Sequence, residues 1–177
     1  ELTYVATDST ESDVINGLVA AWNATTEPEF GEVSAAYTAS TGLVLTCNTL
    51  GLPFTVTASA TGGITPTVTE TTSATGPNHL DNGDNYEGGT APGTGDDIVI
   101  RNTADSILYA LESADLFGDI TVDSTFTGEI GLPEINAADY VEYRPTFLKR
   151  GAAAFTLEVG IGNGRKSPRI NIDANAS

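Results

Sequence analysis

The stretch Gly95-Asp96-Asp97-Ile98-Val99-Ile100 marks the point at which the character of this 177-residue chain changes. Upstream of its aliphatic half, the chain is rich in threonine and in turn-forming residues and contains no Lys or Arg. Downstream, short aliphatic segments alternate with glycines, and Arg101 is the first basic residue. We therefore expect two modules, residues 1–72 and 98–177, joined by an ordered connector over residues 73–97.

The first module shows one helical pattern followed by alternating patterns. Apolar residues recur at helical spacing from Val14 to Trp22, and Thr10 can cap the segment, which predicts one amphipathic helix over about residues 11–23. From Glu32 onward apolar residues recur at every second position, which is typical of strands. Strands are expected over residues 2–6, 33–39, 43–48, 54–60 and 64–72. The module is therefore predicted to be an α+β sheet with one helix on its apolar face.

The second module is expected to contain only strands. Asp97-Ile98-Val99-Ile100 and Asp119-Ile120-Thr121-Val122 look alike and begin 22 residues apart, about one coil of a β-solenoid. Short β-branched segments divided by glycines predict an all-β module of β-solenoid or β-sandwich type. Its expected strands are residues 98–101, 107–111, 120–123, 129–132, 141–143, 147–148, 155–159 and 169–173. The fold class predicted for the whole chain is mainly β.

The charge of the chain limits its partners. The sequence contains 24 acidic and 7 basic residues, which gives a formal net charge of -17. The acidic residues before Ile98 are accompanied by no Lys or Arg in that part of the chain. DNA, RNA and anionic membranes require Lys and Arg, so no nucleic acid and no membrane partner is expected. The acidic surface indicates either adaptation for solubility or docking on cations or a basic partner.

The connector has the densest set of oxygen ligands in the chain. Asp81, Asp84, Asp96 and Asp97 are the candidate ligands, and carboxylate-rich loops are the sites that calcium prefers. The spacing does not match an EF-hand, so the same residues can instead be turn formers. No other cofactor is expected. Leu80 and Tyr86 are expected to anchor the connector by packing.

A basic and aromatic segment near the end of the chain is the candidate protein interface. Six of the seven bases fall between Arg144 and Arg169, among aromatic residues. This mixture is typical of protein interfaces. The alternative is that these bases neutralise acids of their own module. The candidate interface residues are Tyr140, Tyr143, Arg144, Phe147, Lys149, Arg150, Arg165, Lys166 and Arg169.

An ordered series of motifs resembles a known protein family. The motifs are Gly17-Leu18-Val19-Ala20-Ala21-Trp22-Asn23-Ala24 with Pro28-Glu29-Phe30, Gly51-Leu52-Pro53-Phe54-Thr55-Val56-Thr57, Gly76-Pro77-Asn78, Gly95-Asp96-Asp97-Ile98-Val99-Ile100, Thr127-Gly128-Glu129-Ile130-Gly131-Leu132-Pro133 and Tyr140-Val141-Glu142-Tyr143-Arg144. Together they resemble proteins of tailed phages, prophages and some environmental bacteria that are assigned to the virion structure. The resemblance spans nearly the whole chain.

Two functions of different classes follow. The resemblance implies a capsid decoration (cement) or tail-surface protein on the virion surface, forming a homo-oligomer such as a trimer and binding a major capsid or tail protein. The alternative is a glycan-binding or glycan-degrading β-solenoid, in which Glu129 with Glu134, or Asp119 with Asp123, would supply the carboxylate pair. No enzymatic activity is expected, since His79 is the only histidine and no nucleophile-elbow motif accompanies it.

Overall fold

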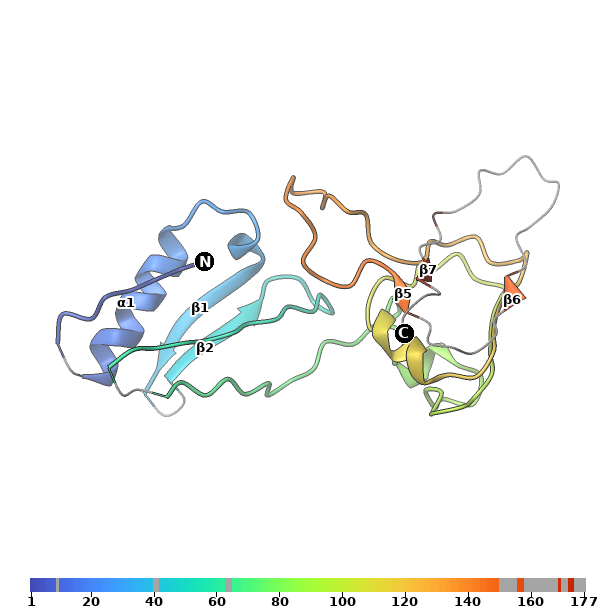
Figure 1. Cartoon of the computed structure of the whole chain (residues 1–177), viewed down its shortest axis with the longest axis horizontal. Helices are drawn as coiled ribbons and strands as arrows, with labels where there is room; N and C mark the ends of the chain where they lie inside the picture. The colour runs from blue at the N-terminus through green and yellow to red at the C-terminus, as the bar shows by residue number, and fades with distance from the viewer. Residues whose placement is uncertain are drawn as a thin grey trace. The chain divides into compact units, whose positions relative to one another are not determined.

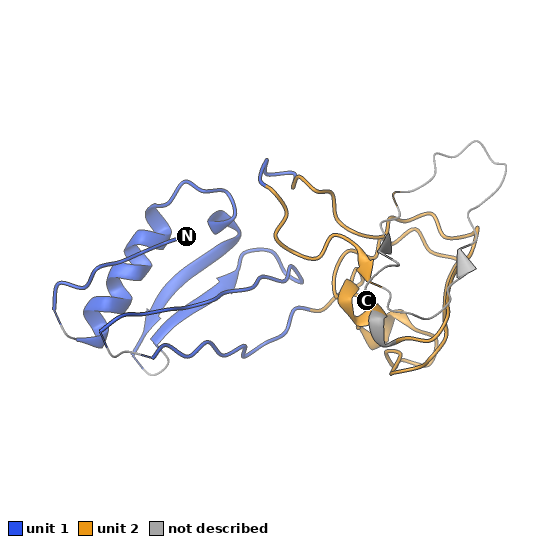
Figure 2. Cartoon of the chain, in the orientation of Figure 1, with its two compact units in different colours: residues 1–74, 137–140 blue, residues 75–136, 141–177 orange. Residues whose placement is uncertain are grey.

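The computed structural model describes residues 1–8, 10–39, 42–62, 65–149, 156–157, 169 and 172–173. The chain divides into two compact units, which Figure 2 shows in blue and orange. Unit 1 comprises residues 1–74 and 137–140, and unit 2 comprises residues 75–136 and 141–177. Most of the segment treated above as a connector is therefore part of unit 2.

Unit 1 is built from one helix and one hairpin. Helix α1 (Glu11–Ala24) is capped at its N-terminus by Thr10, whose hydroxyl accepts a hydrogen bond from the Asp13 N–H. A 3-10 turn (Phe30–Glu32) leads into β1 (Val33–Thr38), which pairs in antiparallel fashion with β2 (Gly42–Cys47). The predicted helix and the first two strands after it are confirmed to within one or two residues at each end.

The helix packs against this hairpin (Figure 1). The Trp22 indole N–H donates to the Val33 carbonyl at 2.7 Å, and the Phe30 ring meets the indole edge-on at a centroid distance of 4.7 Å. Among the described residues of unit 1, the buried hydrophobic side chains are those of Ile15, Val33, Ala35 and Tyr140. Unit 1 therefore has a small core.

The predicted strand over residues 2–6 is wrong, because this segment lies against α1 instead. The Tyr4 ring occupies the space where a side chain at Gly17 would stand, with ring atoms 2.0–2.3 Å from an ideal Cβ. The Asp13 carboxylate accepts the backbone N–H groups of Thr7 and Asp8 at 2.8 and 3.2 Å. Since those N–H groups are already used, Thr7 and Asp8 cannot continue the segment into a sheet through them.

The predicted strands over residues 54–60 and 64–72 are also wrong. Their described residues are extended but pair with no other strand in the described part of the chain. Alternating apolar and polar residues favour an extended backbone. A strand also requires hydrogen bonds to the backbone of a neighbouring strand, which the pattern does not specify.

Unit 2 is held together by short parallel contacts. β3 (Ile98–Ile100), β4 (Ile120–Val122) and β6 (Thr156–Leu157) form a three-stranded parallel sheet, in which Ile98 lies opposite Ile120. A second parallel pair joins β5 (Leu148–Lys149) to β7 (Ile172–Asp173).

Residues 96–107 run parallel to residues 118–131 beyond the limits of the strands. The Gly118 N–H donates to the Asp96 carbonyl at 2.8 Å, and the Thr127 N–H donates to the Thr103 carbonyl at 2.9 Å. Further along, the Ile107 N–H donates to the Glu129 carbonyl at 2.7 Å. The two look-alike segments noted in the sequence thus lie side by side in register.

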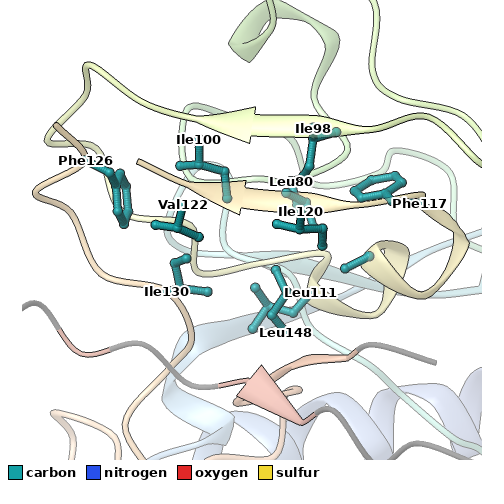
Figure 3. Close-up of a cluster of buried hydrophobic side chains, with 11 residues drawn as sticks. Leu80, Ile98, Ile100, Leu111, Phe117, Ile120, Val122, Phe126, Ile130 and Leu148 are labelled. Atoms are coloured by element: carbon teal, nitrogen blue, oxygen red, sulfur yellow. The ribbon is translucent and has the colours of Figure 1, made fainter. Parts of the chain in front are cut away.

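The core of unit 2 lies under these parallel segments, as Figure 3 shows. Leu80 belongs to this cluster and Tyr86 packs against it, so both anchor the former connector as expected. The buried cluster consists of Leu80, Ile98, Ile100, Leu111, Ala114, Phe117, Ile120, Val122, Phe126, Ile130 and Leu148.

The prediction of a mainly β fold with an all-β second module is wrong. The structure is about 17% helical and 18% strand, and its described residues form neither a barrel nor a solenoid. The described part of unit 2 contains two 3-10 helices, Gly83–Asn85 and Leu111–Leu116, and its strands are two or three residues long. Several segments expected to be strands make only isolated bridges, such as Ile107 with Ile130. Bends between those bridges stop the alternating segments from extending into longer ladders.

Candidate functional site

The candidate interface in unit 2 is the segment of residues 141–149, which is fixed at both ends. At its start the Glu142 N–H donates to the Glu134 carbonyl at 2.9 Å. At its end Leu148 is 1% exposed within the core cluster, and β5 pairs with β7. Because both ends are held, the directions of the side chains between them are fixed as well.

Two charged side chains of this segment, those of Glu142 and Arg144, point inward. Arg144 Nη1 donates to Glu142 Oε1 at 2.9 Å, and the Arg144 backbone N–H donates to the same oxygen at 3.1 Å. The other carboxylate oxygen accepts from the Asn136 amide at 2.8 Å. Both charged side chains are almost fully buried, 4% exposed for Arg144 and 0% for Glu142. A buried pair of this kind requires such hydrogen bonds to offset the cost of leaving water.

Three apolar side chains of the same segment point outward. Val141 is 69% exposed, Tyr143 is 41% exposed and Phe147 is 49% exposed. Successive side chains of an extended chain point to opposite sides, so a shift of one residue would bury the apolar row and expose the charges. In the structure Glu142 and Arg144 are buried, whereas the apolar side chains at the alternate positions are exposed. We call Val141, Tyr143 and Phe147 the outward row.

The Arg144 side chain therefore makes its contacts within its own unit. Besides its ion pair, its guanidinium carbon lies 4.4 Å from the centroid of the Tyr143 ring, in a cation–π contact. The Tyr143 side chain remains partly exposed beside this contact.

The remaining predicted interface residues differ from one another. Tyr140 belongs to unit 1, where it is buried and its hydroxyl donates to the Glu32 carboxylate. Lys149 is exposed beside the outward row. Arg169 pairs with Glu129 at 2.8 Å and donates to the Gly131 carbonyl at 2.7 Å. Three residues, Arg150, Arg165 and Lys166, lie outside the described residues.

The four candidate calcium ligands have separate contacts with the protein. The Asp97 carboxylate accepts the Asp119 N–H at 2.7 Å, and the Asp96 carboxylate accepts the Gly93 N–H at 2.8 Å. Asp84 lies in the 3-10 turn capped by the Asn82 side chain. Asp81 lies 3.8 Å from the His79 ring nitrogen. Within the described ranges, no group of three or more His, Cys, Asp or Glu side chains could hold a metal ion.

Two of the carboxylates considered for glycan chemistry, those of Glu129 and Asp123, have partners within the chain. Glu129 is paired with Arg169, as described above. The Thr125 backbone N–H and hydroxyl, both 2.7 Å from the Asp123 carboxylate, hold the pKa of Asp123 below its usual value. A general acid needs a raised pKa, so Asp123 is perturbed in the wrong direction for that role.

The sequence reasoning missed the buried ion pair and the open row beside it. The alternation Val141-Glu142-Tyr143-Arg144 shows that two faces exist, but it gives no indication that the charged face points inward. The nearest clue was the opposite charge of Glu142 and Arg144 at a spacing of two, which places both side chains on one side of an extended chain.

Comparison of the chain with protein-family models, with curated proteins and with solved structures found no match. No helix in the described part of the chain is both long and apolar enough to cross a membrane.

Proposed function

We propose that this chain is a structural protein of a tailed-phage-like virus particle, a capsid decoration or tail-surface protein that binds neighbouring subunits and stabilises the assembly. In this proposal it acts on the outside of the particle, as a homo-oligomer, and catalyses no reaction. Its partners are copies of itself and a major capsid or tail protein.

The observation that carries the proposal is the outward row. Exposed apolar side chains that lie close together mark sites of interaction with other proteins. Aromatic residues, here Tyr143 and Phe147, are enriched at the centres of protein interfaces. The series of motifs that resembles virion proteins ends in this same segment, at Arg144.

The test is binding to particles produced by the source organism. The variant Val141→Asn with Phe147→Asn replaces two exposed apolar side chains and leaves the Glu142–Arg144 pair untouched. The wild-type chain is expected to cosediment with the particles, and the double variant is expected to bind at least ~10-fold more weakly, since interface anchors of this type contribute about 2 kcal/mol each. Circular dichroism checks that the variant remains folded.

The matched control is Val5→Asn, which changes a side chain that is 81% exposed in unit 1. This control is expected to bind particles as the wild type does. Failure of the wild-type chain to cosediment with any particle, or full binding by the double variant, would overturn the proposal. Reversing Arg144 to glutamate is a poor test, because it would bury two carboxylates together and unfold the segment.

A further inference from the structure

Two segments of unit 1 are extended, exposed and without a hydrogen-bonded partner. Residues 54–62 and 65–72, which we call the extended arm, form no hydrogen bond to another segment within the described part of the chain. Nearly all of their residues are exposed, and Phe54 and Val56 are half-buried. Figure 1 draws both segments as extended tubes rather than arrows. Their Thr- and Val-rich composition favours strands, so they have the conformation of strands but lack pairing.

The hairpin of the same unit has one covered edge and one open edge. In an antiparallel ladder, the backbone groups of successive residues point alternately toward the partner strand and away from it. The Asn48 N–H donates to the Glu32 carbonyl, so Glu32 points toward β2. The carbonyls of Val33 and Ala35 therefore point away from β2. Side chains of α1 cover both: Trp22 donates to Val33 at 2.7 Å and Asn23 donates to Ala35 at 3.3 Å.

On β2 the outward backbone groups belong to Leu43, Leu45 and Cys47, which lie opposite Tyr37, Ala35 and Val33. Among the described residues, nothing outside the hairpin ladder bonds to these groups. Natural proteins usually protect such an edge with charges, prolines or a covering element. β2 carries no charge and no proline. The edge of β2 is therefore open to another strand.

The hairpin and the arm share a second property, which is the absence of charge. Residues 33–69 contain no Asp, Glu, Lys or Arg, in a chain whose net charge is -17. The only charged residue of the arm is Glu70. A partner with a basic surface would be attracted to the acidic residues elsewhere on unit 1. Two copies of the same acidic chain, in contrast, repel each other least where neither of them carries charge.

We propose that the extended arm of one copy adds as strands to the open edge of β2 in a second copy of this chain. Each copy then gives an arm and accepts one, so the exchange can close into a symmetric dimer or a ring. Strand addition would enlarge a two-stranded sheet, which is marginal by itself, into one with more strands and more buried apolar surface. The inference rests on the proposed function for its biological setting, but its test needs only the purified chain.

The experiment compares the self-association of purified full-length chains by sedimentation velocity. The variant combines Thr57→Pro with Ala58→Pro and Thr67→Pro with Val68→Pro, so that N–H groups on both sides of each segment are removed. Because these residues bond to nothing within one copy, the folding of the monomer should be unaffected. The wild type is expected to form a dimer or a larger ring, and the variant is expected to associate at least ~10-fold more weakly.

The matched control combines Thr57→Ala, Thr67→Ala and Val68→Ala, which keep every backbone N–H. It is expected to associate like the wild type, and hydrogen exchange at residues 54–62 and 65–72 is expected to slow on association. A wild type that stays monomeric, or a proline variant that associates normally, overturns the inference. A monomeric wild type that still cosediments with particles would reject strand exchange alone, whereas an oligomer that binds no particle would reject the particle function alone.

Discussion

At the scale of single residues, the Glu142–Arg144 pair decides what the candidate interface presents. Both charges are buried and hydrogen-bonded to each other, and Asn136 completes the carboxylate's contacts. A pair of this kind adds little net stability compared with apolar side chains, but it is strongly destabilising to break. Its structural effect is to hold the backbone in the register that turns Val141 and Tyr143 outward.

Replacing Arg144 by methionine is therefore expected to lower the free energy of unfolding by about 3–5 kcal/mol, because the Glu142 carboxylate is left buried without its cation. Adding Glu142→Gln is expected to restore much of that loss. Urea denaturation measures both variants. The control Lys149→Met changes an exposed base and should stay within about 0.5 kcal/mol of the wild type. Equal stabilities for Arg144→Met and Lys149→Met would show that the pair does not hold the segment.

Tyr86 gives a second prediction at this scale, for alkaline pH. Burial, with a smaller effect of the Asp81 charge, raises the pKa of the Tyr86 phenol from 10.0 to about 12. The phenol donates to the Leu80 carbonyl at 2.6 Å, which requires the protonated form. A raised pKa in the folded state means that this contribution is complete below pH 10 and is lost as the pH rises toward 12.

The melting temperature of the wild type should therefore fall between pH 10 and 12 more steeply than that of Tyr86→Phe. The phenylalanine variant should also be less stable at neutral pH by about 1 kcal/mol, because it loses one hydrogen bond. Tyr37→Phe, at a largely exposed tyrosine, should keep the wild-type pH profile. Parallel profiles for wild type and Tyr86→Phe would contradict the assigned shift.

At the scale of elements, the sequence predicted correctly those elements whose contacts lie close together along the chain. Helix α1 was predictable because its cap at Thr10 and its apolar spacing lie within one segment. The β1–β2 hairpin was predictable for the same reason. The arm was predicted as strands and is extended but unpaired, because no local pattern tells whether a distant backbone supplies the partner.

The candidate site was predictable to a similar extent. The mixture of aromatics and bases identified the segment around Tyr143 and Phe147, and both residues are partly exposed. The assignment of Arg144 to the exposed side could not be checked from the sequence, because an extended segment with charges on one face and apolar residues on the other fits either orientation. Only tertiary contacts, such as that of Asn136 with Glu142, decide between the two.

The close approach of neighbouring parallel segments depends on Gly128. A Cβ built at Gly128 would lie 2.4 Å from the Asp105 carbonyl oxygen, a backbone atom that cannot move without displacing the adjacent segment. Gly128→Ala is therefore expected to destabilise unit 2 by about 1–3 kcal/mol. Gly31→Ala is the control, since a Cβ there meets nothing within 4 Å, and it should be neutral or stabilising. Thermal denaturation of both variants checks the difference, and equal melting temperatures would contradict it.

At the scale of the whole molecule, the distribution of charge limits how copies can meet. Unit 1 contains nine acids and no base, whereas unit 2 contains fifteen acids and seven bases. Both units are thus acidic, and two copies repel each other at long range. Two kinds of contact can overcome this repulsion: bases of one copy against acids of another, or the charge-free residues 33–69 of both copies.

Salt separates these two kinds of contact. Raising the ionic strength from about 0.01 M to about 1 M shortens the screening length from about 30 Å to about 3 Å. A contact between bases and acids would weaken, because its attraction is screened. A contact through residues 33–69 should strengthen, because screening removes the general repulsion and leaves apolar burial and backbone pairing intact.

We expect self-association of the wild type to tighten as salt is added, by ~10-fold or more across this range. Sedimentation equilibrium at several salt concentrations measures it. Lys149→Gln serves as the control, because it removes an exposed base of the candidate particle interface and should leave the salt dependence unchanged. Association that weakens with salt, and weakens further in Lys149→Gln, would instead assign self-assembly to the basic segment and leave the charge-free surface without a role.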